Sequence, residues 1–219
     1  MPGRLKPSIR PRRTPAQARS LETWDVTLEA TIQVLVKGGY ERLTTTKVAE
    51  RARVSVGTLY QYFPNKHALL AAVFERHVDG VASSVEEACR RSHGLSLEEM
   101  VFTLCTSFIE AKLHRADLAI ALRPVLAELG GDDVVRKRSG RTAQAIAAML
   151  RTANPPVEEL SARTIQVFVA AIVGVVDDAL ARNTTASGLR SLCDELVVLG
   201  AAYLRSTSRR AGRERRRAS

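Results

Sequence analysis

The sequence predicts an all-α fold of about nine helices, and three observations support that prediction. Apolar residues recur at helical spacing through most of the chain, and residues that cap helices stand before these segments. No stretch alternates apolar and polar side chains as a strand would. Aromatic residues make up only 5% of the 219 residues, while Ala, Leu and Arg are frequent, which favours helix.

Four helices are predicted in the first 91 residues, each with a start or stop signal. The first ends at Gly38-Gly39, where glycine permits a left-handed backbone. Thr44 and Ser55 suit the N-caps of two short helices, and Asn65 caps a fourth helix after a proline ends the third. The four predicted spans are residues 21–37, 45–52, 56–62 and 66–91.

Five further helices are predicted beyond residue 94. Ser96 and Glu99 form a capping box at the start of the first of them. An Asn-Pro-Pro break at residues 154–156 precedes a long apolar helix, and a polar turn precedes the last one. The predicted spans are residues 96–114, 118–129, 134–152, 157–182 and 189–204.

The net charge of +10 lies at the two ends of the chain. Residues 1–20 carry six basic and no acidic side chains, and residues 205–219 carry seven arginines and one glutamate. The segment between them holds 20 basic and 22 acidic side chains. We expect a disordered basic arm at 1–20 and a disordered basic tail at 205–219. Such ends suit the phosphates of DNA or RNA, or they are solvated ends without a specific partner.

The sequence argues against a membrane protein, a secreted protein and an enzyme. It shows no secretory leader and no uninterrupted apolar run of about 18 residues. Cys89, Cys105 and Cys193 are widely spaced and odd in number, which favours reduced, buried thiols in a cytoplasmic protein. The four histidines are scattered, and no glycine-rich phosphate loop or nucleophile–base set is present. We therefore expect no enzymatic activity, no cofactor and no metal.

The third predicted helix has two different faces on a helical wheel. Its apolar face holds Leu59 and Phe63, which we expect to be core residues. Tyr60 lies at the edge of that face, where its ring can pack while its hydroxyl stays exposed. The opposite face is small and polar, without a long charged side chain, and comprises Gly57, Thr58, Gln61 and Tyr62.

Two short helices joined by a tight turn, with a longer helix on each side, predict a helix-turn-helix. In that arrangement the second short helix enters the DNA major groove. Thr and Gln side chains can contact base edges there, and Tyr hydroxyls can hold phosphates. The helix start at Asn65-Lys66 offers free N–H groups and a cation to a further phosphate. The alternative is that the aromatic residues only form the core of a small helical subdomain.

The segment LTTTKVAERARVSVGTLYQYFPNKHALL, residues 43–70, resembles the DNA-binding motif of the tetracycline-repressor (TetR) family of bacterial transcriptional regulators. The likeness is dense in VSxGTLYxYF and NKxxLL and spans about 60 residues, from Glu22 to Ala82. It implies a DNA-binding domain at 21–82, with its motif at about 45–64. The remaining helices, 83–204, would form a domain for effector binding and dimerisation.

The resemblance also implies which residues meet DNA. Arg53 departs from the family pattern, because it stands where glycine is usual in the turn. A non-glycine residue there costs about 1 kcal/mol if the backbone needs a positive φ, and Arg53 could reach a phosphate. Although the wheel places Val56 on the packing side, its position in the first turn allows contact with DNA. The expected DNA-binding residues are Thr44, Thr45, Thr46, Arg53, Val56, Gly57, Thr58, Tyr60, Gln61, Tyr62 and Lys66.

The last two predicted helices are the expected dimer interface. The helix at 157–182 is apolar around most of its circumference, which indicates burial on more than one side. The resemblance implies a four-helix bundle made from these two helices of each subunit; the alternative is burial within one subunit. The expected interface residues are Ala170, Gly174, Asp177, Ala181, Leu196, Leu199 and Tyr203.

The middle helices would then enclose an effector pocket. The candidates are mostly apolar, which favours a modest-sized apolar effector, although each of them also suits ordinary core. They are Met100, Thr103, Cys105, Phe108, Leu118, Leu122, Met149 and Phe168.

The expected function is therefore that of a sequence-specific DNA-binding regulator. We expect a repressor that binds a palindromic operator as a homodimer and is released by a small ligand. The alternative is a ligand-independent architectural DNA-binding protein, for which the two basic ends are the main support.

Overall fold

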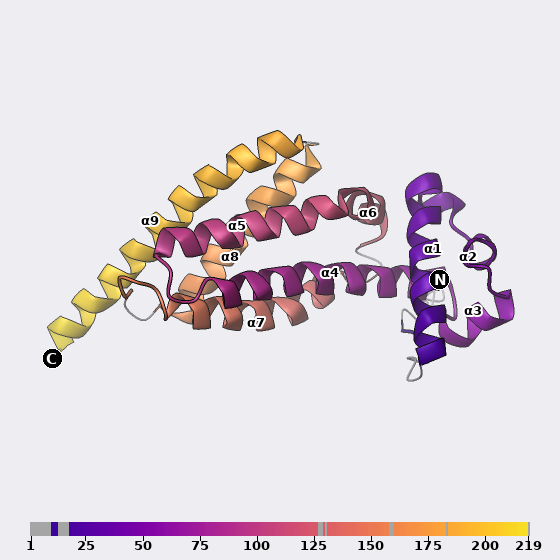
Figure 1. The fold of residues 1–219 in the computed structure, drawn as a ribbon, viewed down its shortest axis with the longest axis horizontal. Helices are drawn as coiled ribbons and strands as arrows, with labels where there is room; N and C mark the ends of the chain where they lie inside the picture. Colours follow the sequence, from indigo (N-terminus) through magenta and orange to yellow (C-terminus); the bar gives the residue numbers. More distant parts are fainter. Residues whose placement is uncertain are drawn as a thin grey trace, which may run out of the picture. The chain divides into compact units, whose positions relative to one another are not determined.

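The structure is a computed structural model that describes residues 10–12, 18–126, 129, 131–157, 160–182 and 184–218. The all-α prediction is confirmed, since the described residues form nine α-helices, one short 3-10 helix and no strand. The elements in Figure 1 are α1 (Ala18–Arg42), α2 (Thr45–Ala52), α3 (Val56–Tyr62), α4 (Lys66–Arg91), α5 (Leu97–His114), α6 (Ala116–Leu122), η1 (Arg123–Val125), α7 (Gly131–Leu150), α8 (Ala162–Ala181) and α9 (Ala186–Ala218).

The chain divides into two compact units. Unit 1 comprises Met1–Val78 and Asp117–Val135, and unit 2 comprises Asp79–Ala116 and Arg136–Ser219. The expected single boundary near residue 82 does not account for α6 and η1, which join the first unit. These two elements bring Leu118, Leu122 and Val125 into the buried core of unit 1. α6 and η1 belong to unit 1 because their apolar side chains are buried in its core. Spacing in the sequence does not show which of the two cores buries a given residue.

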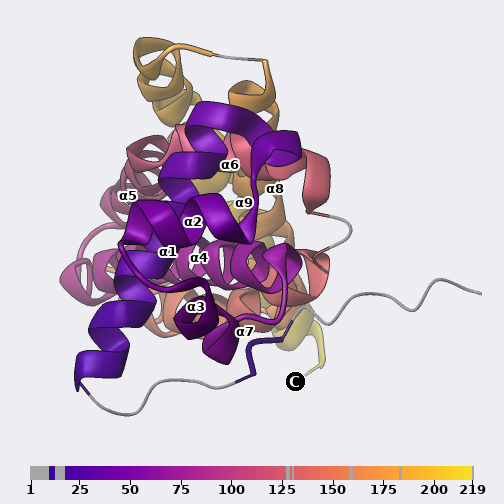
Figure 2. The same ribbon diagram turned by 90° about the vertical axis from the view of Figure 1, so that its right-hand side faces the viewer.

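Unit 1 is built around α1, with α2 packed against it and α3 packed against α2 (Figure 2). Leu28, Ile32 and Leu35 of α1 recur at helical spacing and are all buried. The predicted left-handed stop is present: Gly39 has φ 72° and ψ 172° and interrupts α1 before its last three residues. Only glycine adopts this conformation without strain, and it redirects the chain toward α2.

Unit 2 packs α5 and α8 against α9 around a second apolar core. Gly200 of α9 permits this close packing. A Cβ atom at this position would lie 2.7 Å from the Phe168 ring of α8 and 3.0 Å from Val101 of α5. Since real Cβ atoms do not approach so closely, we expect any larger residue at position 200 to separate the three helices.

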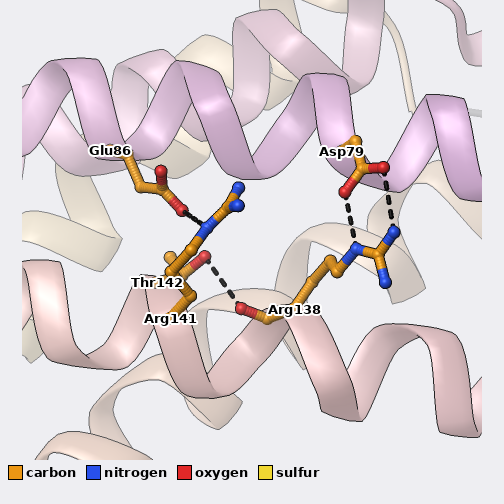
Figure 3. Close-up of polar contacts among 5 residues, drawn as sticks. All are labelled: Asp79, Glu86, Arg138, Arg141 and Thr142. Atoms are coloured by element: carbon orange, nitrogen blue, oxygen red, sulfur yellow. Dashed lines mark hydrogen bonds and ion pairs between the residues drawn. The ribbon is translucent and has the colours of Figure 1, made fainter. Parts of the chain in front are cut away.

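Two ion pairs join α4 to α7 within unit 2 (Figure 3). Arg138 donates two hydrogen bonds to Asp79, Nε to Oδ1 at 2.6 Å and Nη2 to Oδ2 at 3.0 Å. Arg141 donates from Nε to Oε1 of Glu86 at 2.6 Å. The hydrogen bond from Arg138 is the main reason that the pKa of Asp79 is lowered from its ordinary value, against the opposing effect of burial. The pairs therefore fix the register of the two helices.

Three expectations about helix ends are wrong. The helix predicted from residue 157 begins at Ala162, because the Ser161 side chain caps it by accepting a hydrogen bond from the Thr164 N–H. The last helix does not end near residue 204 but continues to Ala218, so the described part of the predicted disordered tail is helical. The predicted helix at 118–129 is instead α6 followed by the short η1. The basic arm at 1–20 lies mostly outside the described residues.

α8 is also long and apolar enough to cross a membrane by length and composition alone. Its most apolar 18-residue window has a mean hydropathy of 1.8 and is 33% buried. Polar residues, among them Asp177 and Asp178, interrupt this helix, so it contains no uninterrupted apolar run of about 18 residues. A helix of a water-soluble protein that is apolar on both its buried and its exposed face passes the same test.

All three cysteines are free and buried, as the sequence predicts. Burial is the main reason that the pKa of Cys89 is raised to about 11 and that of Cys105 to about 12. The Cys193 thiol lies 3.5 Å from the Thr106 hydroxyl between α9 and α5. These thiols act as small core residues rather than reactive groups.

Candidate nucleic-acid interface

Side chains cap the starts of both short helices, α2 and α3. The Thr44 hydroxyl accepts a hydrogen bond from the Lys47 N–H at 3.2 Å, and Ser55 Oγ accepts one from the Thr58 N–H at 2.9 Å. Between the helices Arg53 adopts a left-handed conformation, φ 56° and ψ 38°, and its N–H bonds back to α2. The condition under which a non-glycine residue is costly here, a positive φ, is therefore met. The geometry is that of a helix-turn-helix.

α3 is held from behind by fully buried side chains. Leu59 and Phe63 are both 0% exposed, as the helical wheel predicts. The Trp24 ring of α1 packs on the Phe63 ring with 4.4 Å between centroids and meets Tyr62 edge-on at 6.1 Å. Because α3 has only seven residues, this packing rather than its own length must fix its position.

The outward face of α3 is small and polar, as predicted, with three refinements. Gly57 and Gln61 are exposed, and Thr58 is half-buried because its hydroxyl also bonds to the Ser55 cap. Val56 is 37% exposed, so it does not pack as the wheel suggested. Tyr62 is only half-buried against Trp24, so it combines a packing ring with an accessible edge.

The N-terminal end of α2 lies beside α3 through one side-chain contact. The Tyr60 hydroxyl of α3 is 3.2 Å from the Thr45 hydroxyl of α2, and Tyr60 is 39% exposed. Thr44 and Thr46 are exposed on either side of Thr45. The hydroxyls of both helices are therefore gathered on one surface.

The start of α4 carries a positioned cation. Asn65 Oδ1 accepts a hydrogen bond from the Ala68 N–H at 2.9 Å, which confirms the predicted cap. The Lys66 ammonium lies 4.0 Å from the centroid of the Tyr40 ring, a cation–π contact. The Tyr40 hydroxyl is in turn 3.1 Å from Nε2 of His67. The contact of Tyr40 with Lys66 was not predicted from the sequence. An aromatic residue directly after the helix break at Gly39 could have indicated a role for Tyr40 at this surface.

One described residue of the basic arm also reaches this surface. The Arg12 N–H donates to the Tyr62 carbonyl oxygen at 2.8 Å, at the C-terminal end of α3. The Arg12 side chain is exposed.

The predicted pocket residues do not form one cluster. Leu118 and Leu122 are buried in the core of unit 1, whereas the sequence analysis grouped them with the middle helices. Thr103 is half-buried, and its hydroxyl donates to the Glu99 carbonyl oxygen at 2.8 Å. The other five are buried together in the core of unit 2: Met100, Cys105, Phe108, Met149 and Phe168.

The predicted interface residues also separate. Leu196 is 2% exposed and belongs to the core of its own unit, because it faces inward on α9. Asp177 is exposed and binds Lys112 of α5, with 2.7 Å between Oδ1 and Nζ. Ala181 and Tyr203 are half-buried, and Ala170, Gly174 and Leu199 are exposed.

Sequence reasoning missed three large exposed apolar residues on the same two helices. Val167 and Val175 of α8 are 46% and 37% exposed, and Val198 of α9 is 68% exposed. Their signal was present in the sequence, since α8 is apolar on more faces than one core can bury. Among the described residues, no three His, Cys, Asp or Glu side chains lie close enough together to hold a metal ion.

Two short capped helices, the second held by buried residues and exposing a small polar face, define a helix-turn-helix DNA-binding protein. Residues 28–73 match the family model described as bacterial regulatory proteins of the tetR family. Residues 96–204 match the model of the tetracyclin repressor-like C-terminal domain. The chain belongs to the TetR family and is a DNA-binding transcriptional regulator.

Relatives of known name are similar over part of their length. The HTH-type transcriptional repressor KstR of Mycolicibacterium smegmatis is 37% identical over 89 residues, which are 41% of this chain and 40% of the repressor. The chain therefore matches less than half of that relative. Two solved structures share the fold: the fatty acid degradation regulator FadR of Bacillus halodurans and FadR of Bacillus subtilis in complex with stearoyl-CoA. The first has a TM-score of 0.65 and 20% identity, and the match covers 86% of this chain and 97% of the other. The second has a TM-score of 0.62 and 19% identity, and the match covers 82% of this chain and 98% of the other.

Proposed function

We propose that this protein is a transcriptional repressor whose α3 reads a palindromic operator in the DNA major groove. The observation that carries the proposal is the division of α3 between buried Leu59 and Phe63 and exposed Gly57 and Gln61. The bare backbone at Gly57 allows close approach to the groove floor, and the Gln61 amide can pair with adenine. Thr58 and Val56 lie on the same helix within reach of neighbouring bases or thymine methyls.

Phosphate contacts would surround this reading face and fix its register. We assign this role to the hydroxyls of Thr44, Thr45, Thr46, Tyr60 and Tyr62 and to the cations of Arg53 and Lys66. Lys66 is pre-positioned because the Tyr40 ring lies 4.0 Å below its ammonium. The backbone bond from Arg12 to the end of α3 would bring the basic arm to the flanking minor groove.

A homodimer would supply two such reading faces for a two-fold operator. The exposed apolar side chains of α8 and α9 are the support for this step, since a second copy can bury them. Val167, Gly174 and Val175 are exposed on α8, and Val198 and Leu199 on α9. Pairing these helices with their copies would form a four-helix interface that takes the apolar face of α8 out of water.

We further propose that a small apolar effector binds in unit 2 and releases the DNA. The core there is apolar, with Met100, Phe108 and Phe168 among its buried residues. FadR of Bacillus subtilis, which shares the fold, was solved with stearoyl-CoA, an acyl thioester. Binding would favour a spacing of the two reading faces that does not match the operator. The protein would work in the cytoplasm, associated with the nucleoid when bound to DNA.

Selection of bound sequences from random or genomic DNA with the purified protein tests the proposed function. We expect enrichment of one palindrome, with a preference that persists as salt rises. Uniform affinity for all sequences, with a steep salt dependence, would instead identify an architectural DNA-binding protein. Recovery of no DNA would contradict both functions.

The dimer is tested separately by placing a charge on the exposed apolar face. Val198→Asp should shift the protein from dimer to monomer in light scattering, because an unpaired carboxylate would be buried at the interface. Val26→Asp is the matched control, since Val26 is 43% exposed on α1 of the other unit. An unchanged mass for Val198→Asp would exclude this face as the interface.

A further inference from the structure

Unit 1 has a second feature, a hollow between the end of α1 and the outer face of α2. Its volume is about 550 Å³, and it is open to solvent. We call it the basic hollow, because five of its eight lining residues are cationic and only Glu50 is acidic. The lining residues are Val34, Lys37, Gly38, Arg42, Lys47, Glu50, Arg51 and Arg53.

The described residues supply no ion-pair partner for the cations of the basic hollow. Lys37, Arg42, Lys47, Arg51 and Arg53 are all exposed, and none forms an ion pair with a carboxylate among the residues that the structure describes. Arg76 of the same unit, by contrast, pairs with Asp25 and Glu29. Like charges gathered on one wall repel each other, so the hollow is suited to an anion that would relieve this repulsion.

Local backbone geometry holds the cations together. The break at Gly39 redirects the last residues of α1, and Lys47 Nζ donates to the Arg42 carbonyl oxygen at 3.0 Å. Lys47 and Arg51 are one turn apart on α2, on the side away from the buried Val48, Ala49 and Ala52. Lys47 and Arg51 therefore face outward because the opposite side of α2 is packed against the core of unit 1.

The hollow meets the proposed reading surface at the turn between α2 and α3. Thr45 contacts Tyr60 of α3 on one side of α2, whereas Lys47 lines the basic hollow on the other side. Arg53 belongs to both, as the residue of the turn and as part of the lining. A strand of phosphates that leaves the reading surface past Arg53 would therefore reach these cations.

The lining favours a phosphate backbone over a free nucleotide. Only Val34 and Gly38 offer uncharged surface, and no aromatic ring lines the hollow. A nucleobase would need a stacking partner or an apolar wall, whereas backbone phosphates need only cations and room.

We propose that the basic hollow holds phosphates of the operator DNA that flanks the base pairs read by α3. The proposal rests on the proposed DNA-binding function. The hollow adds sequence-independent affinity, lengthens the DNA that one subunit covers and leaves the choice of sequence to α3.

The test compares two double variants on the selected operator, in a short duplex and in one with long flanks. Arg42→Gln with Arg51→Gln removes two cations of the hollow; Lys137→Gln with Arg151→Gln removes two exposed cations of unit 2. Fluorescence anisotropy gives Kd as a function of salt. Each lost phosphate contact should flatten the slope of log K against log salt by about 0.9. Between 50 and 200 mM salt the wild-type affinity should then fall about 12-fold more than that of the hollow variant.

We expect this change on the long duplex, little change on the short one, and an unaltered preferred sequence. The unit 2 variant should behave as wild type, and thermal melting should show that both variants are folded. A wild-type slope for the hollow variant, on DNA that it still selects, would overturn the proposal while leaving the DNA-binding function intact. Tight binding of pyrophosphate or ATP that leaves the DNA salt slope unchanged would assign the hollow to a small anion and also overturn it. If Lys37→Gln alone reproduces part of the flattening, the wall as a whole is responsible.

Discussion

Two surfaces of this protein, one on each unit, meet solvent in opposite ways. In unit 1, α3 buries Leu59 and exposes Gly57 and Gln61 next to the basic residues of α2 and the turn. Unit 2 fills its own core but leaves Val167, Val175, Val198 and Leu199 of α8 and α9 exposed. Exposed cations and hydrogen-bond donors can bind an anionic partner. Exposed apolar side chains lower the free energy only when another apolar surface covers them. The surface of α2 and α3 thus suits a charged partner, whereas the exposed face of α8 and α9 suits an apolar one.

The largest expected effect breaks the support behind the reading face. Phe63→Ala should lower the stability of unit 1 by about 3–5 kcal/mol, because it empties a fully buried site beside Trp24. Trp24 is the only tryptophan in the chain, so its fluorescence in urea follows this unit specifically. Leu21→Ala is the control, since Leu21 on α1 of the same unit is 46% exposed. Equal losses in both variants would show that burial does not distinguish the two sites.

The next effect separates reading from packing within α3. Gln61→Ala should lower affinity for the preferred operator by about 1–3 kcal/mol, because one base loses its hydrogen-bond partner. Stability should change by less than about 0.5 kcal/mol, since Gln61 is exposed. Tyr62→Phe keeps the ring against Trp24 and tests the hydroxyl alone, with Gln144→Ala of α7 as the control in binding assays. A loss of stability in Gln61→Ala would place that side chain in the core instead.

A smaller effect concerns the ion pairs of unit 2. A double-mutant cycle on Asp79 and Arg138 should give a coupling of about 1 kcal/mol, because the pair is bidentate and the Arg138 side chain is only 21% exposed. The exposed pair of Asp178 and Arg182 should give about 0.3–0.5 kcal/mol.

The first coupling should also depend on pH with a defined sign. The pKa of Asp79 is lowered in the folded protein, so its contribution is fully present above the ordinary carboxyl pKa of about 3.9 and is lost as pH falls through the lowered folded value. Urea unfolding at a series of pH values measures it. A coupling that weakened between pH 8 and pH 5 would contradict this assignment.

The smallest effect tests the turn. Arg53→Gly should raise the stability of unit 1 by up to about 1 kcal/mol, because glycine adopts the φ of 56° without strain. It should also weaken DNA binding by removing a cation. Arg51→Gly lies inside α2 and should instead destabilise the unit by about 1 kcal/mol. Two substitutions of the same kind, two residues apart, would thus change stability in opposite directions.

The sequence predicted unit 1 well because its determinants are local. Thr44, Ser55 and Asn65 each satisfy the backbone N–H three residues ahead, and Arg53 takes the only left-handed position in the turn. Such signals need only a few neighbouring residues, so one chain is enough to find them. The contact of Lys66 with Tyr40 and the lining of the basic hollow were missed, because they join residues on different helices.

Unit 2 was predicted less well because its determinants lie far apart in the chain. Leu118 and Leu122 have the same spacing as pocket residues would have, and only packing reveals that they belong to the other core. Leu196 and Leu199 are neighbours on α9, yet one is buried and the other is 53% exposed. Helical periodicity ranks residues by face, but it does not say which partner each face meets.

The buried cysteines make the protein suitable for distance measurements by energy transfer. With a pKa of about 11 and about 12, the thiols of Cys89 and Cys105 are almost entirely protonated at neutral pH, and Cys193 is 5% exposed. A maleimide dye would therefore react selectively with a cysteine introduced at an exposed position such as Glu41. Donor and acceptor dyes on two copies bound to one duplex would report the separation of the ends of their α1 helices. The native thiols would not have to be removed first.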